Sequence, residues 1–238
     1  MNIEGRNAVS EALKADTTFE SLLVEKGMQH SIVAMARSKG VKIQFVDKAV
    51  LDKISVTKKH QGFIGKITDF EYCEVEDILN LAKQRGEDAF VVILDGVEDP
   101  HNLGSILRVC ECAGVHGVVI PKNRAVGVNE TVIKTSAGAA QHMLVSRVSN
   151  LSNVVADLKR AGLWVYAADM DGQDIYTTDL KGKICLVVGG EGKGVGKLLK
   201  ENCDGVVALP LKGKVNSLNA SVACGVVVYE ALRQRLKG

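Results

Sequence analysis

The segment FVVILDGVEDPHNLGSILR, residues 90–108, decides the fold. Its first five residues are all apolar, which is typical of a strand buried on both faces of a parallel sheet. A turn that contains Pro100 follows, and a helix is expected to open near Asn102. Ligands of parallel α/β sheets bind in the loops that follow the carboxyl ends of the strands. The segment therefore predicts a parallel α/β sheet with a ligand site just beyond this strand.

Two polar residues of this segment are candidates for a functional role. Asn102 either caps the helix or serves a ligand, and the segment alone leaves both readings open. Arg108 lies six positions later, inside a largely apolar helix. A charge in such a place needs a partner unless it faces the surface.

Strands alternate with helices on the C-terminal side of residue 89. Beyond the strand just quoted, buried strands are predicted over residues 117–120, 163–168, 184–188 and 205–209. Helical patterns are predicted over residues 103–113, 130–139, 151–161 and 220–236. This alternation favours one parallel α/β domain over residues 89–238.

A smaller α/β unit is expected over residues 1–70. Helices are predicted over residues 5–14, 31–39 and 49–54, and strands over residues 22–25, 41–46 and 63–68. This unit carries 11 Lys and Arg against 8 Asp and Glu, whereas residues 71–90 carry 2 against 6. The acidic stretch indicates a linker that runs into a short helix, residues 71–88, between the two domains.

Composition excludes several classes of protein. The net charge is only +2, so composition gives no sign of the strongly basic surface of many nucleic-acid-binding proteins. Aromatic residues make up only 4%, which argues against base stacking as the main mode of contact. The 6 cysteines form no C-x-x-C pair, which argues against zinc and for reduced thiols in the cytoplasm. The N-terminus lacks an apolar signal region, and no apolar run is long enough to span a membrane.

Two further polar loops follow predicted strands. The first, VVGGEGKGVGK at residues 187–197, fits neither a P-loop nor a G-x-G-x-x-G fingerprint, and Glu191 within it would repel phosphates. The second, ALPLKGKVNSLNAS at residues 208–221, places Ser217, Asn219 and Ser221 around one helix start. A single N-cap needs one such side chain, so the other two are free for a ligand.

These three motifs resemble those of the SpoU (TrmH-type) RNA 2'-O-ribose methyltransferases. In that family D-x-x-x-x-P-x-N-x-G-x-x-x-R, G-x-E-x-x-G and L-P-x-x-G-x-x-x-S-L-N-x-S occur in the same order. The opening residues 4–9, EGRNAV, are similar to the L30e/L7Ae-like substrate-binding domain of the RlmB subgroup, which methylates a guanosine of 23S rRNA. The resemblance covers nearly the whole chain.

The resemblance implies a fold, a cofactor and a site. It implies a SPOUT-type catalytic domain with a C-terminal trefoil knot, working as a homodimer through that domain. S-adenosyl-L-methionine would bind Gly190, Glu191, Gly192, Leu209, Leu211, Ser217, Leu218 and Asn219. The catalytic residues would be Arg108, Asn102, Glu191, Ser217 and Asn219, and no metal is expected. Because a guanidinium is not deprotonated in proteins, Arg108 would orient a ribose phosphate that takes the proton, and would stabilise the developing alkoxide.

The same resemblance implies a structured RNA partner, with ribosomal RNA preferred. The basic loop at residues 58–62 is either merely solvated or contacts RNA phosphates, and Arg6, Lys58, Lys59 and His60 are the candidate contacts. Methylation of a tRNA, or of an rRNA adenosine in antibiotic resistance, is the alternative within the family. Outside it, the alternative is an RNA-binding ribosome-assembly module without catalysis.

Overall fold

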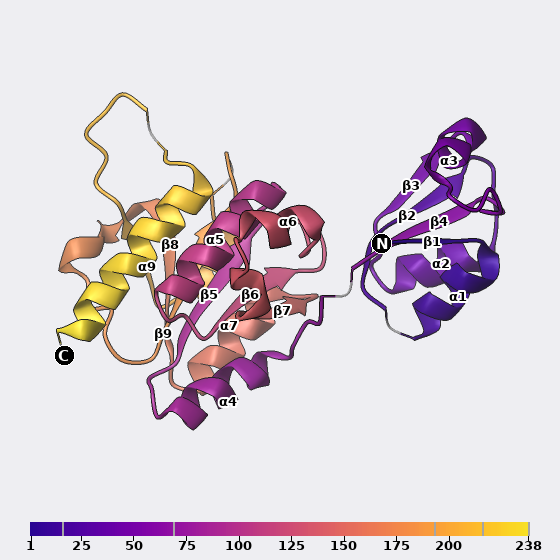
Figure 1. Ribbon diagram of the computed structural model, residues 1–238. Coiled ribbons are helices and arrows are strands. Elements are labelled where there is room, and N and C mark those ends of the chain that lie inside the picture. The colour runs from indigo at the N-terminus through magenta and orange to yellow at the C-terminus, as the bar shows by residue number, and fades with distance from the viewer. Residues whose placement is uncertain (16, 69, 193, 216, 238) are drawn as a thin grey trace. The chain divides into compact units, whose positions relative to one another are not determined.

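The computed structural model describes residues 1–15, 17–68, 70–192, 194–215 and 217–237. The chain divides into two compact units, Met1–Glu71 and Tyr72–Gly238 (Figure 1). Each unit has its own sheet and its own buried core, as a domain that folds around one core does.

The N-terminal unit contains a four-stranded sheet in the order β1-β4-β2-β3. Strand β2 pairs parallel with β3 and antiparallel with β4, and β4 pairs antiparallel with β1. The core under α1 and α2 includes Val9, Leu22, Ile32 and Phe63, each at most 1% exposed. The elements are β1 (Asn2–Glu4), α1 (Arg6–Lys14), β2 (Phe19–Glu25), α2 (Ser31–Ser38), β3 (Ile43–Val46), α3 (Lys48–Ile54) and β4 (Phe63–Ile67).

The C-terminal unit is built on a six-stranded sheet in the order β10-β8-β9-β5-β6-β7, and every neighbouring pair is parallel. The strands are β5 (Phe90–Asp95), β6 (Gly117–Pro121), β7 (Leu144–Val148), β8 (Trp164–Asp174), β9 (Ile184–Gly189) and β10 (Gly205–Ala208). The helices are α4 (Val75–Arg85), α5 (Pro100–Cys112), α6 (Glu130–Thr135), α7 (Leu151–Arg160), α8 (Lys197–Asn202) and α9 (Ala220–Leu236). The expected α/β fold with a parallel sheet is confirmed.

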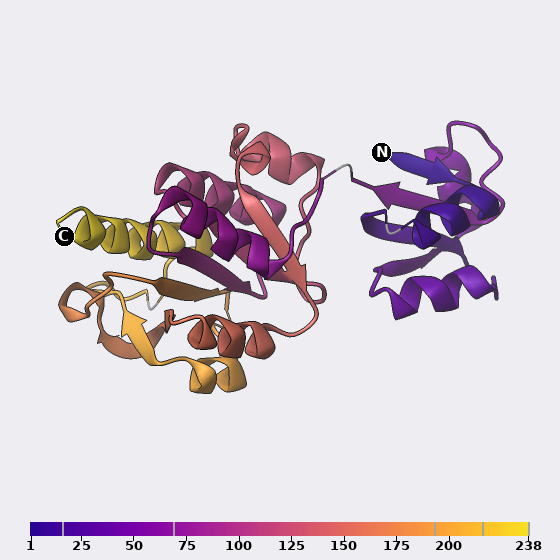
Figure 2. The ribbon, with the colours of Figure 1, turned by 90° about the horizontal axis from the view of Figure 1, so that it is seen from below.

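The surroundings of strand β5 explain why its first five residues are all apolar. Val91 and Ile93 are fully buried in a cluster that includes residues of α4, α7 and α8. Phe90 points to the other face, where the guanidinium of Arg235 on α9 lies 5.1 Å from the centre of its ring. Figure 2 shows α7 and α8 on one side of the sheet and α5 and α9 on the other. Because successive side chains meet different helix layers, no position from Phe90 to Leu94 faces water.

Three strands depart most from the sequence prediction, while α6 ends at Thr135 rather than at residue 139 and β3 begins at Ile43 rather than at residue 41. Strands β1 and β7 were not expected, since both are short and depend on pairing with β4 and β6. Strand β8 continues past its predicted end at residue 168, and its pairing with β10 shifts between Val206 and Val207. A Cβ atom on Gly172 would lie 2.6 Å from the carbonyl carbon of Val206, so this close approach of two strands requires glycine.

Candidate active site

The loop that follows β9 folds back onto the end of β5. Gly190 donates its backbone N–H to the carbonyl of Asp95 at 2.7 Å, and Gly196 donates to the Asp95 carboxylate at 2.8 Å. A Cβ atom on Gly189 would lie 2.1 Å from the carbonyl carbon of Gly194, and one on Gly190 would lie 2.0 Å from the carbonyl oxygen of Gly96. Gly190 is therefore required by backbone contact between the two loops, and Gly189 by backbone contact within the loop that follows β9.

A shared carboxylate joins the three sequence motifs. Oε1 of Glu191 accepts hydrogen bonds from Nδ2 of Asn102 at 2.8 Å and from Nδ2 of Asn219 at 2.7 Å. Nδ2 of Asn219 also donates to Oδ1 of Asn102 at 3.0 Å. Segments 89 and 28 residues apart in sequence from Glu191 thus meet at one oxygen atom.

At the start of α5, one residue caps the helix and another contributes to the site. Asp99 caps α5, because its Oδ1 accepts the N–H of His101, and this leaves the side chain of Asn102 to Glu191. Asn219 both caps α9 and contributes to the site. Its Oδ1 accepts the N–H groups of Ser221 and Val222 at the start of α9, while its Nδ2 donates into the site.

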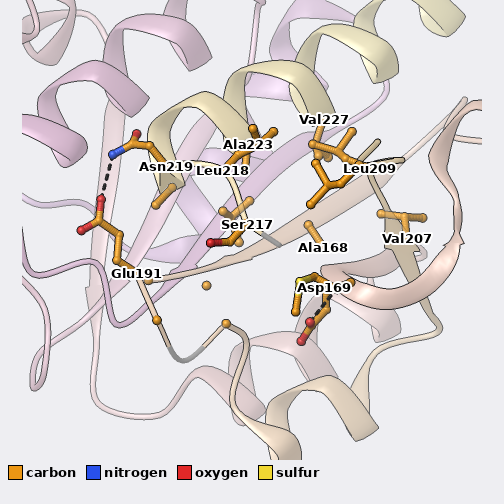
Figure 3. Close-up of a pocket in the computed structure, with 18 residues that line it drawn as sticks. Ala168, Asp169, Glu191, Val207, Leu209, Ser217, Leu218, Asn219, Ala223 and Val227 are labelled. Carbon is orange, nitrogen blue, oxygen red and sulfur yellow. Dashed lines mark hydrogen bonds between the residues drawn. The ribbon is translucent and has the colours of Figure 1, made fainter. Parts of the chain in front are cut away.

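A pocket of about 550 Å³ opens beside this cluster. Figure 3 shows Glu191 and Asp169 at opposite sides of the pocket, with Ser217 between them. Its apolar wall is formed by side chains from β8, β9, β10, α9 and the loop before α9, among them Ala168, Val188, Val207, Leu209 and Val227. All the residues predicted to bind a cofactor line it, namely Gly190, Glu191, Gly192, Leu209, Leu211, Ser217, Leu218 and Asn219.

Asp169 is a pocket residue that the sequence reasoning missed. Its Oδ1 accepts the N–H of Met170 at 2.7 Å, and its Oδ2 accepts from Nζ of Lys200 at 3.1 Å. Lys200 also donates to Asp171, and these two carboxylates raise the pKa of the Lys200 ammonium. The signal was present, since Asp169 follows the apolar part of a parallel strand, where α/β folds place ligand-binding residues.

Arg108 stands apart from the other predicted catalytic residues. It is exposed on α5 and is not among the residues that line the pocket. Six residues of an α-helix turn the chain by about 600° and advance it about 9 Å, so Arg108 leaves the helix on a different side from Asn102. The structure thus brings Asn102, Glu191, Ser217 and Asn219 to one place but leaves the guanidinium outside it.

The N-terminal unit gathers three of its four predicted RNA contacts. The backbone N–H of Arg6 donates to Gln61, and the exposed side chains of Lys58 and Lys59 belong to the same loop. Glu4 fixes this loop by accepting hydrogen bonds from Ser55, Val56 and Thr57.

His60 requires a correction, because it is only 4% exposed. Its Nε2 lies 2.9 Å from Oδ1 of Asp52 and its Nδ1 accepts the N–H of Gly62. The imidazole therefore holds the loop and is not placed to touch RNA.

Across the part of the chain that the structure describes, no group of three or more His, Cys, Asp or Glu side chains could hold a metal ion. None of the described helices combines the length and apolarity that crossing a bilayer requires. Cys110, Cys185 and Cys224 are buried free thiols, and burial raises the pKa of Cys185 well above its usual range.

Comparison with known proteins assigns the chain. The profile of the SpoU rRNA Methylase family matches residues 89–229, and that of the RNA 2'-O ribose methyltransferase substrate-binding domain matches residues 2–73. The chain belongs to the SpoU family. It is therefore an RNA methyltransferase, and the resemblance noted in its motifs is confirmed.

Two relatives named as methyltransferases match along almost their full length. The TrmH family protein YacO of Bacillus subtilis (strain 168) is 44% identical over 97% of this SpoU chain and 94% of its own. A Xanthomonas campestris protein named 23S rRNA (guanosine-2'-O-)-methyltransferase RlmB is 40% identical, covering 98% and 96%. The AdoMet complex of AviRb from Streptomyces viridochromogenes superposes with a TM-score of 0.64 at 22% identity, covering 100% and 91%.

Replacing Gly190 by alanine should push the loop after β9 away from the end of β5, because the new Cβ atom would overlap the carbonyl oxygen of Gly96. Overpacking of this kind lowers stability by about 1–3 kcal/mol, which corresponds to a fall of about 2–12 °C in Tm for a chain of this size. Thermal unfolding of Gly190→Ala measures it. The matched control is Gly213→Ala, where the nearest atom to the new Cβ would be 4.0 Å away. Equal Tm values for the two variants would contradict the assigned close contact.

The titration of Glu4 tests how the basic loop is held. Hydrogen bonds from Thr57, Ser55 and the backbone lower the pKa of Glu4 from 4.5 to about 2. Because the folded-state pKa lies below the ordinary value, ionised Glu4 stabilises the loop above pH 4.5, and this is lost as the pH falls through about 2. Thr57→Val removes the largest contribution, so the pKa of Glu4 should rise toward 4.5 in an NMR titration. Ser38→Ala, which removes a hydroxyl bonded to Met35 instead, should leave it at about 2.

Proposed function

We propose that this protein transfers the methyl group of S-adenosyl-L-methionine to a ribose 2'-hydroxyl of structured ribosomal RNA, with a guanosine of 23S rRNA as the target. One observation carries the cofactor assignment. The described lining of the pocket holds two carboxylates, Asp169 and Glu191, and no lysine or arginine. Such a lining suits an adenosine derivative that carries a positive charge, and it repels the phosphates of ATP or a dinucleotide.

The relatives support the same assignment. Proteins named 23S rRNA (guanosine-2'-O-)-methyltransferase RlmB, from Xanthomonas campestris and Xylella fastidiosa, share 40% identity over nearly the full length of this chain. Structures of AviRb and of a Sinorhizobium meliloti rRNA methyltransferase contain AdoMet. We carry this cofactor over to residues 190–192, to Leu209 and Leu211 and to residues 217–219, and place the protein in the cytoplasm, where ribosomal RNA is made and modified in bacteria.

The chain has to position a weak acid against an activated methyl group. S-adenosylmethionine supplies that methyl on a sulfonium, so the protein contributes alignment and a path for the hydroxyl proton. Asn102 and Asn219 fix Glu191 on the pocket side of the loop, and Ser217 offers a hydroxyl toward the pocket. Burying Asn102, which is 7% exposed, keeps this arrangement rigid before ligand binds.

Arg108 is assigned to the assembled dimer rather than to the isolated pocket. Helix α9 exposes Val222, Tyr229 and Leu236 at seven-residue spacing, at 51%, 49% and 77% exposure. Helices α5 and α9 pack together, so this apolar stripe and Arg108 belong to the same helix layer. We propose that a second copy covers this layer and that Arg108 then orients the acceptor phosphate in a pocket of the dimer. The C-terminal trefoil knot implied by the motifs is part of the same proposal.

The N-terminal unit is assigned to RNA recognition. Its match to a substrate-binding profile and its exposed Arg6, Lys58 and Lys59 support this. Structured RNA is recognised through loops and backbone rather than through a groove code, which agrees with a modest net charge.

Binding and mapping experiments test the function. Calorimetry should detect S-adenosylmethionine binding to the wild type, and Glu191→Ala should weaken it by about tenfold or more because two amide donors lose their acceptor. Glu201→Ala, on the exposed face of α8, is the control. Mapping 2'-O-methyl groups in total RNA from cells with and without the gene should reveal one lost site in 23S rRNA. A lost site in tRNA would show that the substrate is tRNA and not 23S rRNA. Absence of any cofactor binding would favour an RNA-binding ribosome-assembly module without catalysis.

A mixing experiment tests where Arg108 acts. Arg108→Ala and Glu191→Ala homodimers should each be inactive. If Arg108 serves the pocket of the other copy, dissociating and reassociating a 1:1 mixture restores about a quarter of the wild-type rate, since half the dimers regain one intact site of two. A mixture as inactive as its parents would place Arg108 in the pocket of its own chain. Near-normal single-turnover rates in Arg108→Lys would remove it from catalysis altogether.

A further inference from the structure

A second pocket adjoins the proposed cofactor pocket. It has a volume of about 500 Å³ and is formed by residues 95–99 after β5, by Asn102 at the start of α5, and by Arg124 after β6. It shares Gly190, Glu191, Gly194 and Ala220 with the first pocket. A ligand in one pocket therefore meets a ligand in the other across the Glu191 loop. The volume is within the range that small ligands occupy.

The interior of this second pocket is acidic. Asp95, Glu98, Asp99 and Glu191 all line it. Asp95, Asp99 and Glu191 each have one oxygen engaged by a protein donor, and within the described residues their second oxygens accept no hydrogen bond. Free carboxylate oxygens accept hydrogen bonds from hydroxyl and N–H groups and repel phosphate. The interior thus suits an uncharged ligand rich in hydrogen-bond donors, as a ribonucleoside is.

Arg124 supplies the opposite charge at the rim. It is exposed, and it makes no ion pair with any carboxylate of the described residues. Its φ is +57°, in the left-handed region that side chains other than glycine seldom adopt. The loop is held there by the hydrogen bond from the Val126 N–H to the Val97 carbonyl at 2.9 Å. Strained residues of this kind cluster at ligand sites.

We infer that the second pocket binds the acceptor nucleoside of the RNA and that Arg124 binds one of the two phosphates attached to it, leaving the other to Arg108. This inference rests on the proposed function and names the substrate subsite of the same reaction. Sugar and base enter the acidic interior by donating hydrogen bonds, while the phosphate stays outside, where a planar guanidinium offers two parallel N–H donors. The division keeps the polyanionic backbone away from four carboxylates and sets the register of the ribose against Glu191.

Kinetics on ribosomal RNA from cells that lack the gene form the first test. Arg124→Gln should raise the KM for RNA about tenfold, leave the affinity for S-adenosylmethionine unchanged, and lower the slope of log KM against log salt by roughly 0.7–0.9, the share of one phosphate contact. The matched control is Arg160→Gln, an exposed arginine on α7 that pairs with Asp157. Arg124→Gln and Arg160→Gln with equal KM values and equal salt slopes would overturn the phosphate assignment.

A binding measurement separates this inference from the proposed function. Protein loaded with S-adenosylhomocysteine is titrated with guanosine and with guanosine 3'-monophosphate, and backbone amides are followed by NMR. Shifts are expected at Gly96, Val97 and Val126, and the wild type should prefer the nucleotide by about tenfold, a preference that Arg124→Gln abolishes. Shifts confined to other regions, or a preference that survives the substitution, would refute the inference while cofactor binding stands. Failure to bind S-adenosylhomocysteine would instead remove the proposed function, and this inference with it.

Discussion

One carboxylate oxygen organises the catalytic unit. Oε1 of Glu191 accepts from both Asn102 and Asn219, and so ties the loop after β9 to the starts of α5 and α9. The three groups satisfy one another, which is why a polar cluster can sit at the boundary of a buried core. The contact is possible only because Gly190 lets the loop rest on the backbone of Gly96. Sterics thus set the position of the carboxylate, and the carboxylate sets the positions of two helices.

The distribution of charge resolves an apparent conflict with an RNA substrate. The pocket proposed to bind the methyl donor is acidic, since Asp169 and Glu191 line it and Lys200 donates a hydrogen bond to Asp169. RNA phosphates must then be held by cations elsewhere, and exposed loop residues such as Lys58, Lys59 and Arg124 are candidates. A net charge of +2 is the sum of these opposing regions, so the total says little about partners.

Much of the fold followed from the sequence, because the first five residues of β5 and of β9 are all apolar and only a doubly covered parallel sheet buries both faces. The predictions that were wrong or missing concern features that depend on tertiary contacts. Strand β1 forms only because β4 is beside it, and the burial of His60 depends on Asp52 across the loop. Motif order pointed to Asn102, Glu191 and Asn219. Helical spacing separates Arg108 from Asn102 around α5, but motif order alone gave no sign of that separation. Asp169 was missed because the strand was ended one residue before it.

The two adjoining pockets draw on different stretches of the chain. The first is built from residues 168–227, and the second takes its distinctive side chains from residues 95–124, so they overlap only along the glycine loop and at Ala220. Mutations in the turn after β6, which supplies Arg124 to the second pocket alone, can therefore accumulate without changing the lining of the first pocket. Such an arrangement lets descendants of one ancestor acquire new nucleic-acid targets while inheriting the same donor chemistry intact.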